Sequence, residues 1–74
     1  MKSLFVKISG ITDVSKLAAA ASNVFGDVTV IKGRYAVDGK SIMGLFSLDM
    51  STGATIEYPE DAKDFEAYIM QYKG

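Results

Sequence analysis

Gly39-Lys40-Ser41 is the run of this sequence whose residue types come nearest to phosphate chemistry. In a phosphate-binding loop, backbone amides and a lysine surround the phosphates when Gly-x-x-x-x-Gly-Lys-Ser joins a strand to a helix. Here the spacing fails, because Gly33 is one residue too early and Arg34 stands where the first glycine belongs. The sequence therefore does not predict nucleotide hydrolysis.

The chain has no histidine and no cysteine. Imidazole is the usual general base and a common metal ligand, and thiolates supply most of the remaining nucleophiles and soft ligands. Any enzyme activity would have to use carboxylates, lysine, tyrosine and serine. We therefore expect no enzyme, no metal site and no cofactor, and the absence of cysteine suits a cytoplasmic location.

Ser41 opens an apolar segment that runs from residue 41 to 48. A serine in this place is a natural helix N-cap, whose hydroxyl accepts a hydrogen bond from an amide two or three residues on. A phosphate on the same hydroxyl would face the helix's amide donors and the positive end of its dipole. Ser41 is therefore a candidate for regulatory phosphorylation as well as a cap.

The same segment carries more apolar residues than one side of a short helix can bury. Leu45 and Leu48 share one side and are expected to anchor the segment to the core. Exposed, clustered apolar side chains usually mark partner sites. The candidate partner-binding patch on the other side consists of Ile42, Met43 and Phe46.

Length and charge limit the remaining functions. A chain of 74 residues predicts a single domain, residues 1–74, with a modest core. Eight lysines and arginines against nine aspartates and glutamates give no basic footprint for nucleic acid or for a membrane surface. No transmembrane stretch or signal peptide is recognisable. Other proteins are therefore the expected partners, and the oligomeric state stays open.

The apolar pattern predicts four strands, at residues 2–8, 27–32, 35–37 and 54–58. Turn residues separate them, with Gly33, Asp38-Gly39 and Ser51-Thr52-Gly53 between the later strands. In the last strand, one face is expected to carry Ala54, Ile56 and Tyr58.

Two longer helices are predicted beside the short segment. The first has N-cap oxygens at Thr12 and Asp13, a C-cap at Gly26, and an apolar stripe of Val14, Leu17, Ala18, Ala21, Val24 and Phe25. The second starts at Pro59 and carries a stripe of Ala62, Phe65, Ile69 and Tyr72. If 41–48 is helical, the order is β-α-β-β-α-β-α, an α+β fold.

The run Lys40-Ser41-Ile42-Met43-Gly44-Leu45-Phe46-Ser47-Leu48 resembles the regulatory serine segment of the histidine-containing phosphocarrier protein (HPr) family of the bacterial phosphoenolpyruvate:sugar phosphotransferase system. The resemblance implies an open-faced β-sandwich, in which a four-stranded antiparallel sheet carries three helices on one face. It also implies that Ser41 is the target of an ATP-dependent kinase. The patch would then contact phosphotransferase-system enzymes or a transcriptional regulator.

The family's catalytic signature is missing. There, a phosphoryl-accepting histidine precedes Ala-Arg-Pro-Ala at the start of the first helix, whereas here Thr12 stands in the histidine position and is followed by Asp13, Val14, Ser15 and Lys16. The sequence thus predicts an HPr-like domain that has lost histidine phosphotransfer and serves regulation or protein interaction. Two alternatives stay open, namely a phosphocarrier that uses Thr12, Asp13 or Ser41 as acceptor, and a structural or oligomerising domain.

Overall fold

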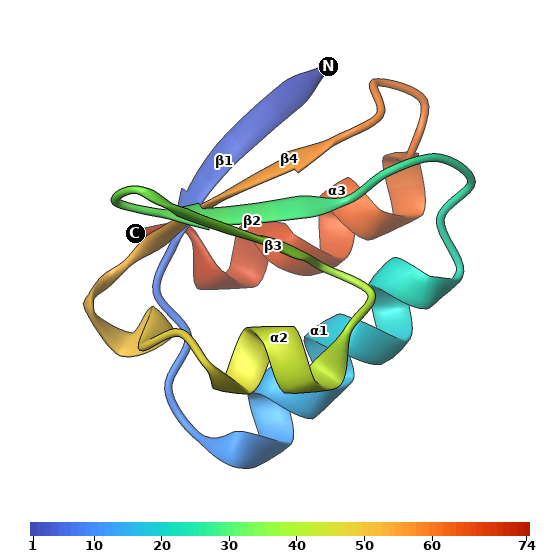
Figure 1. The fold of residues 1–74 in the computed structure, drawn as a ribbon. Coiled ribbons are helices and arrows are strands. Elements are labelled where there is room, and N and C mark those ends of the chain that lie inside the picture. The colour runs from blue at the N-terminus through green and yellow to red at the C-terminus, as the bar shows by residue number, and fades with distance from the viewer.

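Four short strands form one antiparallel sheet in the computed structural model, which describes residues 1–74. The strands are β1 (Lys2–Val6), β2 (Thr29–Lys32), β3 (Tyr35–Asp38) and β4 (Ala54–Tyr58), in the order β1-β4-β2-β3. Three α-helices lie together on one face of the sheet (Figure 1), namely α1 (Ile11–Ser22), α2 (Ile42–Phe46) and α3 (Lys63–Ile69). The predicted α+β class and the open-faced arrangement are confirmed.

The inner face of the sheet supplies half of the core. Ile56, near the middle of β4, lies opposite Leu4 of β1 on one side and Val30 of β2 on the other. Because successive strand residues point to opposite faces, β4 buries alternate residues. The buried residues of β4 are Ala54, Ile56 and Tyr58, as the sequence predicts.

The helices supply the other half. From α1, the buried residues are Val14, Leu17, Ala18 and Ala21, so the predicted stripe is correct through that point. Alanine side chains let a helix approach a sheet closely and favour helix formation. From α3, Phe65 and Ile69 are buried, and the Phe65 ring meets the Tyr58 ring edge to face at 5.8 Å. None of the helices is long and apolar enough to cross a membrane.

The ends of α1 differ from the prediction. The N-cap is Gly10, which has a φ of 97° and no side chain to accept a capping hydrogen bond. Thr12 and Asp13 therefore lie within the first turn and are not N-caps. It ends at Ser22 rather than beside Gly26. Phe25 therefore leaves the predicted stripe and is 97% exposed.

Other predicted boundaries move as well, and strand β2 begins at Thr29 instead of residue 27. Strand β1 ends at Val6 instead of Ile8, although Ile8 stays buried. Helix α3 begins at Lys63 instead of Pro59, because the Ala62 amide first donates to the Pro59 carbonyl in a turn. The predicted turn at 51–53 is mostly a 3₁₀ helix, η1 (Met50–Thr52), and a second one, η2 (Met70–Tyr72), follows α3.

Candidate functional site

Ser41 caps helix α2, as the sequence predicts. Its backbone is extended, and its hydroxyl oxygen accepts a hydrogen bond from the Gly44 amide at 3.2 Å. The preceding turn is held by Asp38, whose Oδ1 accepts from the Lys40 amide at 2.9 Å. The Ser41 side chain is exposed, so the cap leaves its hydroxyl open to solvent.

Helix α2 has one buried side and one exposed side. Leu45 is fully buried and Leu48 packs against the core, which confirms the predicted anchors. The exposed fractions are 42% for Ile42, 81% for Met43 and 46% for Phe46. We call these three residues the α2 patch.

A hollow of about 290 Å³ adjoins the α2 patch, between the loop that precedes α1 and the segment from α2 to η1. Phe46 lines it from α2, and Ile11, which is 74% exposed, lines it from the start of α1. Sequence analysis did not assign Ile11 to the site. The signal available was its place beside Thr12, one residue ahead of the predicted caps.

Asp49 and Ser51 lie at the same hollow. The Ser51 hydroxyl donates to Asp49 Oδ1 at 2.5 Å, and the Ser51 amide donates to the same oxygen at 3.1 Å. These two bonds lower the pKa of Asp49, and the nearby Lys32 ammonium adds to the effect. The Asp49 side chain thus serves as the N-cap of η1 and is held ionised.

The sequence-predicted residues of the first helix lie differently. Thr12 is exposed in the first turn of α1 and does not line the hollow. Asp13 is half-buried near Tyr72. The pKa of Tyr72 is raised, chiefly by its hydrogen bond with Tyr68 and by burial, with a smaller contribution from the Asp13 carboxylate. The two neighbours therefore lie in different surroundings, because Thr12 is exposed to solvent and Asp13 lies near Tyr72.

Lys40 is engaged by the protein itself. Its ammonium Nζ donates to the Val24 carbonyl oxygen, just beyond α1, at 2.9 Å. A phosphate-binding lysine must instead reach the ligand over its loop. The geometry at Gly39-Lys40-Ser41 thus agrees with the rejection of a nucleotide loop on spacing.

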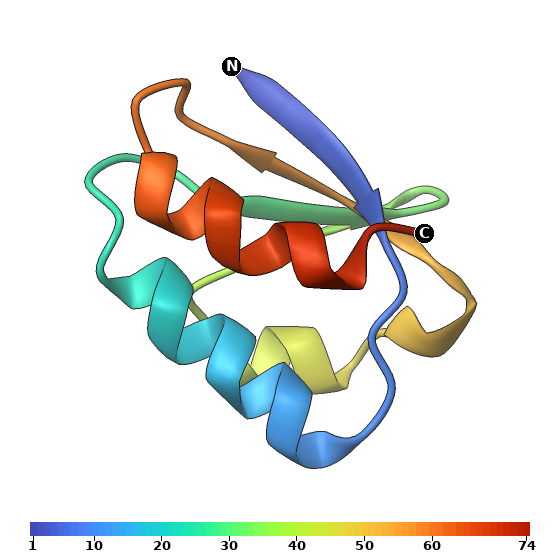
Figure 2. The same cartoon turned by 180° about the vertical axis from the view of Figure 1, so that it is seen from behind.

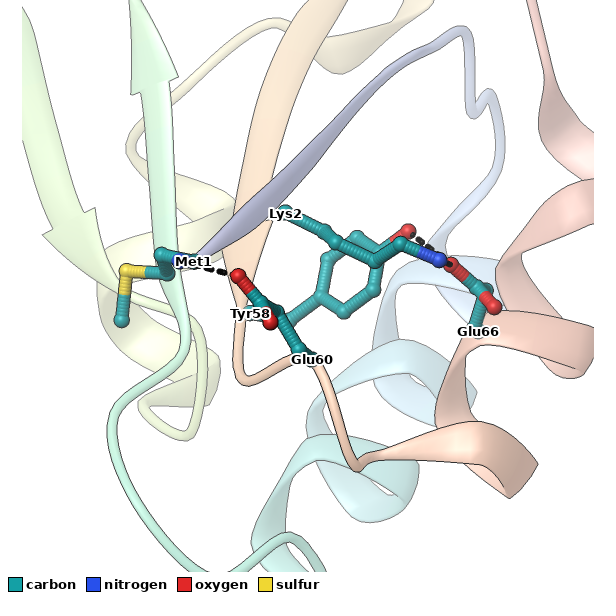
Figure 3. Close-up of polar contacts among 5 residues, drawn as sticks. All are labelled: Met1, Lys2, Tyr58, Glu60 and Glu66. Carbon is teal, nitrogen blue, oxygen red and sulfur yellow. Dashed lines mark hydrogen bonds and ion pairs between the residues drawn. The ribbon is translucent and has the colours of Figure 1, made fainter.

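A separate polar cluster joins the start of β1, the end of β4 and α3 (Figure 3). Glu66 Oε2 accepts from Lys2 Nζ at 2.8 Å and from the Tyr58 hydroxyl at 2.7 Å. These bonds lower the pKa of Glu66, the one from Lys2 most. Burial, together with the bond to Glu66, raises the pKa of Tyr58 to about 12.

This cluster links β1, β4 and α3 and does not extend to the α2 patch. Next to it, the Met1 ammonium pairs with Glu60 at 3.2 Å (Figure 3). The structure holds no group of three or more aspartates or glutamates placed to bind a metal ion. Sequence analysis missed the cluster, because Lys2 and Glu66 are 64 positions apart and no local pattern relates them.

Comparison with known proteins agrees with the fold. Residues 13–70 match the family model described as the PTS HPr component phosphorylation site. The match starts one residue after Thr12. No curated protein matches the chain.

Two solved structures share the fold. The crystal structure of HPr-C-His from Thermoanaerobacter tengcongensis has a TM-score of 0.79 and 23% identity, over 96% of this chain and 89% of that one. The phosphocarrier protein HPr from Bacillus anthracis str. Ames has a TM-score of 0.69 and 25% identity, over 99% of this chain and 94% of that one. Both likenesses extend over almost the whole chain and show the fold.

Proposed function

Because the chain belongs to the HPr family of the phosphotransferase system, we propose that it is a family member without histidine phosphotransfer, which acts in the cytoplasm as a regulatory or interaction domain. The observation that carries the proposal is the α2 patch. Its three apolar side chains are exposed, which supports a partner-binding role, whereas the chain has no histidine with which to carry a phosphoryl group.

The missing group is the imidazole. A phosphocarrier must accept a phosphoryl group and release it readily, and the chain contains no histidine with which to do so. The exposed hydroxyl of Thr12 is a weak nucleophile without an adjacent base. Once formed, a phosphate ester on threonine does not release its phosphoryl group easily. The proposed domain is therefore a binding protein rather than an enzyme.

Incubation with Enzyme I and phosphoenolpyruvate tests the loss of phosphotransfer. Intact-mass measurement is expected to show no added phosphate, under conditions in which the Bacillus anthracis HPr is modified. A phosphate on Thr12, Asp13 or Ser41, located by fragmentation, would refute the proposal. It would favour the alternative of a carrier that uses a different acceptor.

The α2 patch is suited to binding because its apolar side chains are exposed on a helix whose other side is packed in the core. Leu45 fixes the helix against the core, so Ile42, Met43 and Phe46 keep their positions without a partner. Such preorganised apolar groups in the centre of an interface usually contribute most of the binding energy. The proposed partners are phosphotransferase-system enzymes or a transcriptional regulator of the same cell.

Calorimetric titration with the host's Enzyme I and with its regulator tests this surface. Met43→Ser is expected to weaken binding about tenfold or more, as loss of a central interface residue does. Met70→Ser is the matched control, because Met70 is 48% exposed and lies on η2, outside the patch. Equal effects of the two substitutions, or no effect of either, would refute the assignment.

Ser41 supplies the proposed regulation. A phosphate on its hydroxyl would face the Gly44 amide, which already donates to that oxygen at 3.2 Å, and would place negative charge beside Ile42. Treatment with the family's kinase and ATP is expected to modify the wild type but not Ser41→Ala. Ser47→Ala is the control, since the Ser47 hydroxyl lies at the other end of α2 and donates to the Gly44 carbonyl. An unmodified wild type would contradict the regulatory role.

A further inference from the structure

No helix covers the face of the sheet that points away from α1, α2 and α3 (Figure 2). We call it the outer face. Because successive strand residues point to opposite faces, the strand register defines rows of side chains across it. The central row consists of Phe5, Thr55, Ile31 and Ala36. Phe5 is 47% exposed, and its ring lies over Gly53, where an added Cβ would collide with it. The middle of the outer face is therefore mainly apolar.

The two rows that flank the central row carry opposite charges. On one side, the register places Ser3, Glu57, Thr29 and Asp38. Continued by one residue beyond the strands, the register places on the other side Lys7, Gly53, Gly33 and Arg34. Two residues of a strand span about 7 Å, so both rows lie at the same distance from the central one. The outer face is thus negative at one end, apolar in the middle and positive at the other end.

A hollow of about 300 Å³ lies at the negative end, between the start of β2 and the end of β3. Its acidic lining residues are Asp27 and Asp38. Asp27 makes no hydrogen bond or ion pair within the chain, and Asp38 accepts only from the Lys40 amide. The Lys40 ammonium is not available to them, because it donates to the Val24 carbonyl oxygen. The two carboxylates therefore have no cationic partner in their own chain.

Arg34 is free to pair with a carboxylate, but it cannot reach this hollow in its own chain. Its guanidinium makes no hydrogen bond or ion pair within the chain. Arg34 and Asp38 are four strand positions apart, which is about 13 Å and longer than an arginine side chain. The cations at the start of β1 are already used, since the Met1 ammonium and Lys2 each pair with a glutamate. An arginine for the hollow must come from another molecule.

We propose that this molecule is a second copy of the chain, and that two copies stack their outer faces in a symmetric dimer. A two-fold axis along the central row places the positive end of each copy on the negative end of the other. The same axis keeps β3 opposite β3, so that Ala36 faces Ala36, and Arg34 faces Asp38 of the second copy. Symmetric dimers use self-complementary surfaces of this kind. Two stacked sheets lie about 10 Å apart, which leaves room for the side chains between them.

The size of the contact predicts a weak dimer. Four strands about 4.8 Å apart and three rows about 7 Å apart cover roughly 400 Å² on each copy. Specific, stable interfaces bury about 800 Å² on each partner. We therefore expect a dissociation constant of about 0.1–1 mM. Since α2 lies on the helix side of the sheet, the dimer would leave both α2 patches free and would bind more tightly to a partner with two sites.

Sedimentation equilibrium and an NMR dilution series test the dimer on the full chain. Dilution through the expected dissociation constant should shift the amides of the central row, and added salt should favour the monomer. Arg34→Asp and Asp38→Arg are each expected to weaken association at least about tenfold, because each puts like charges opposite one another. Lys16→Asp is the matched control, since it makes the same charge change at an exposed position of α1 and should leave association unchanged.

The two substitutions combined separate the proposed contact from a general effect of charge. In one chain, Arg34→Asp with Asp38→Arg leaves the net charge as it was and restores opposite charges across the axis, so association should return. An equimolar mixture of the two single variants should also associate, for the same reason. Substitution of Asp38 also removes its bond to the Lys40 amide, so the NMR spectrum of each variant serves as the check on the fold.

Any of four results would overturn the proposal. They are a monomer at about 1 mM, an equal loss in Lys16→Asp, no recovery in either the combined variant or the mixture, and dilution shifts centred on the α2 patch. Shifts of the outer face that appear only when Enzyme I is added would assign this face to a different protein and would also overturn it. The presence or absence of phosphate in the Enzyme I mass measurement has no bearing on these results.

Discussion

Leu45 and Phe46 are neighbours on α2, yet their replacement by alanine should affect the protein in opposite ways. Leu45 is fully buried in the core, whereas Phe46 is 46% exposed in the α2 patch. Leu45→Ala should therefore lower the free energy of unfolding strongly and leave the surface chemistry of the patch unchanged. Phe46→Ala should lower the free energy of unfolding only slightly and should remove part of the apolar surface of the patch.

The sizes follow from burial. Removing a fully buried leucine side chain costs about 2–5 kcal/mol, since the surrounding side chains close the cavity only in part. Phe46 already has about half of its surface in water, so its truncation should cost about 1 kcal/mol. A domain of this length has a total stability of roughly 4–11 kcal/mol. Leu45→Ala thus removes a large share of that stability, and Phe46→Ala a small one.

Urea unfolding followed by circular dichroism measures both values. With a slope of about 1 kcal/mol per molar urea for so small a domain, the midpoint should move by about 3 M for Leu45→Ala and by about 1 M for Phe46→Ala. Met70→Ala serves as the control for an exposed residue of similar exposure outside α2.

Either of two results would refute the reasoning. If Phe46→Ala destabilises the chain as much as Leu45→Ala, then Phe46 belongs to the core and the α2 patch is not a free surface. If Leu45→Ala is tolerated as well as Met70→Ala, then α2 is not anchored, and the preorganisation on which the proposed function rests is lost.

Three further outcomes test the fold around the site. Gly53→Ala should destabilise the chain by about 3 kcal/mol, because Gly53 has a φ of 117° and a Cβ would lie 2.8 Å from Phe5 Cε1; a loss below about 1 kcal/mol would contradict this packing. The bond from Lys2 lowers the pKa of Glu66 from its ordinary 4.5, so this stabilisation is present above pH 4.5 and is lost as the pH falls through the lower folded value. The urea midpoint of the wild type should then fall in acid more steeply than that of Glu66→Gln, and parallel curves would contradict the bond. Ser41→Ala should reduce stability by about 1 kcal/mol through loss of the N-cap, whereas Ser41→Asp should retain it; equal stabilities of the two variants in thermal melts would contradict the cap.

The sequence by itself determined the architecture and most of the core. Period-two apolar residues in the strands and helical spacing in the first and last helices were read correctly, because burial of one face requires that spacing. The pattern of residues 41–48 predicted the Ser41 cap, whose hydrogen bond is local, but left the helix itself conditional, and only the resemblance to the HPr family implied α2. The two sides of α2 followed from the same argument, because a five-residue helix cannot turn both sets of apolar residues to one sheet.

Only the tertiary structure decided the helix ends and the long-range contacts. Helical spacing continued through Phe25, but the chain leaves α1 after Ser22, where Lys40 from a distant turn binds the Val24 carbonyl. Pro59 is a favourable first residue of a helix, yet Ala62 bonds back to it in a turn, and α3 starts later.

The Lys2, Tyr58 and Glu66 cluster likewise had no local signal. Its members come from elements that are far apart in the sequence and meet only when the sheet and helices pack. Local spacing determines which face of an element is buried, whereas the free energy that fixes its ends and its surface grooves comes from contacts with other elements. For that reason the exposed side of α2 could be predicted from the sequence, and the Lys2, Tyr58 and Glu66 cluster could not.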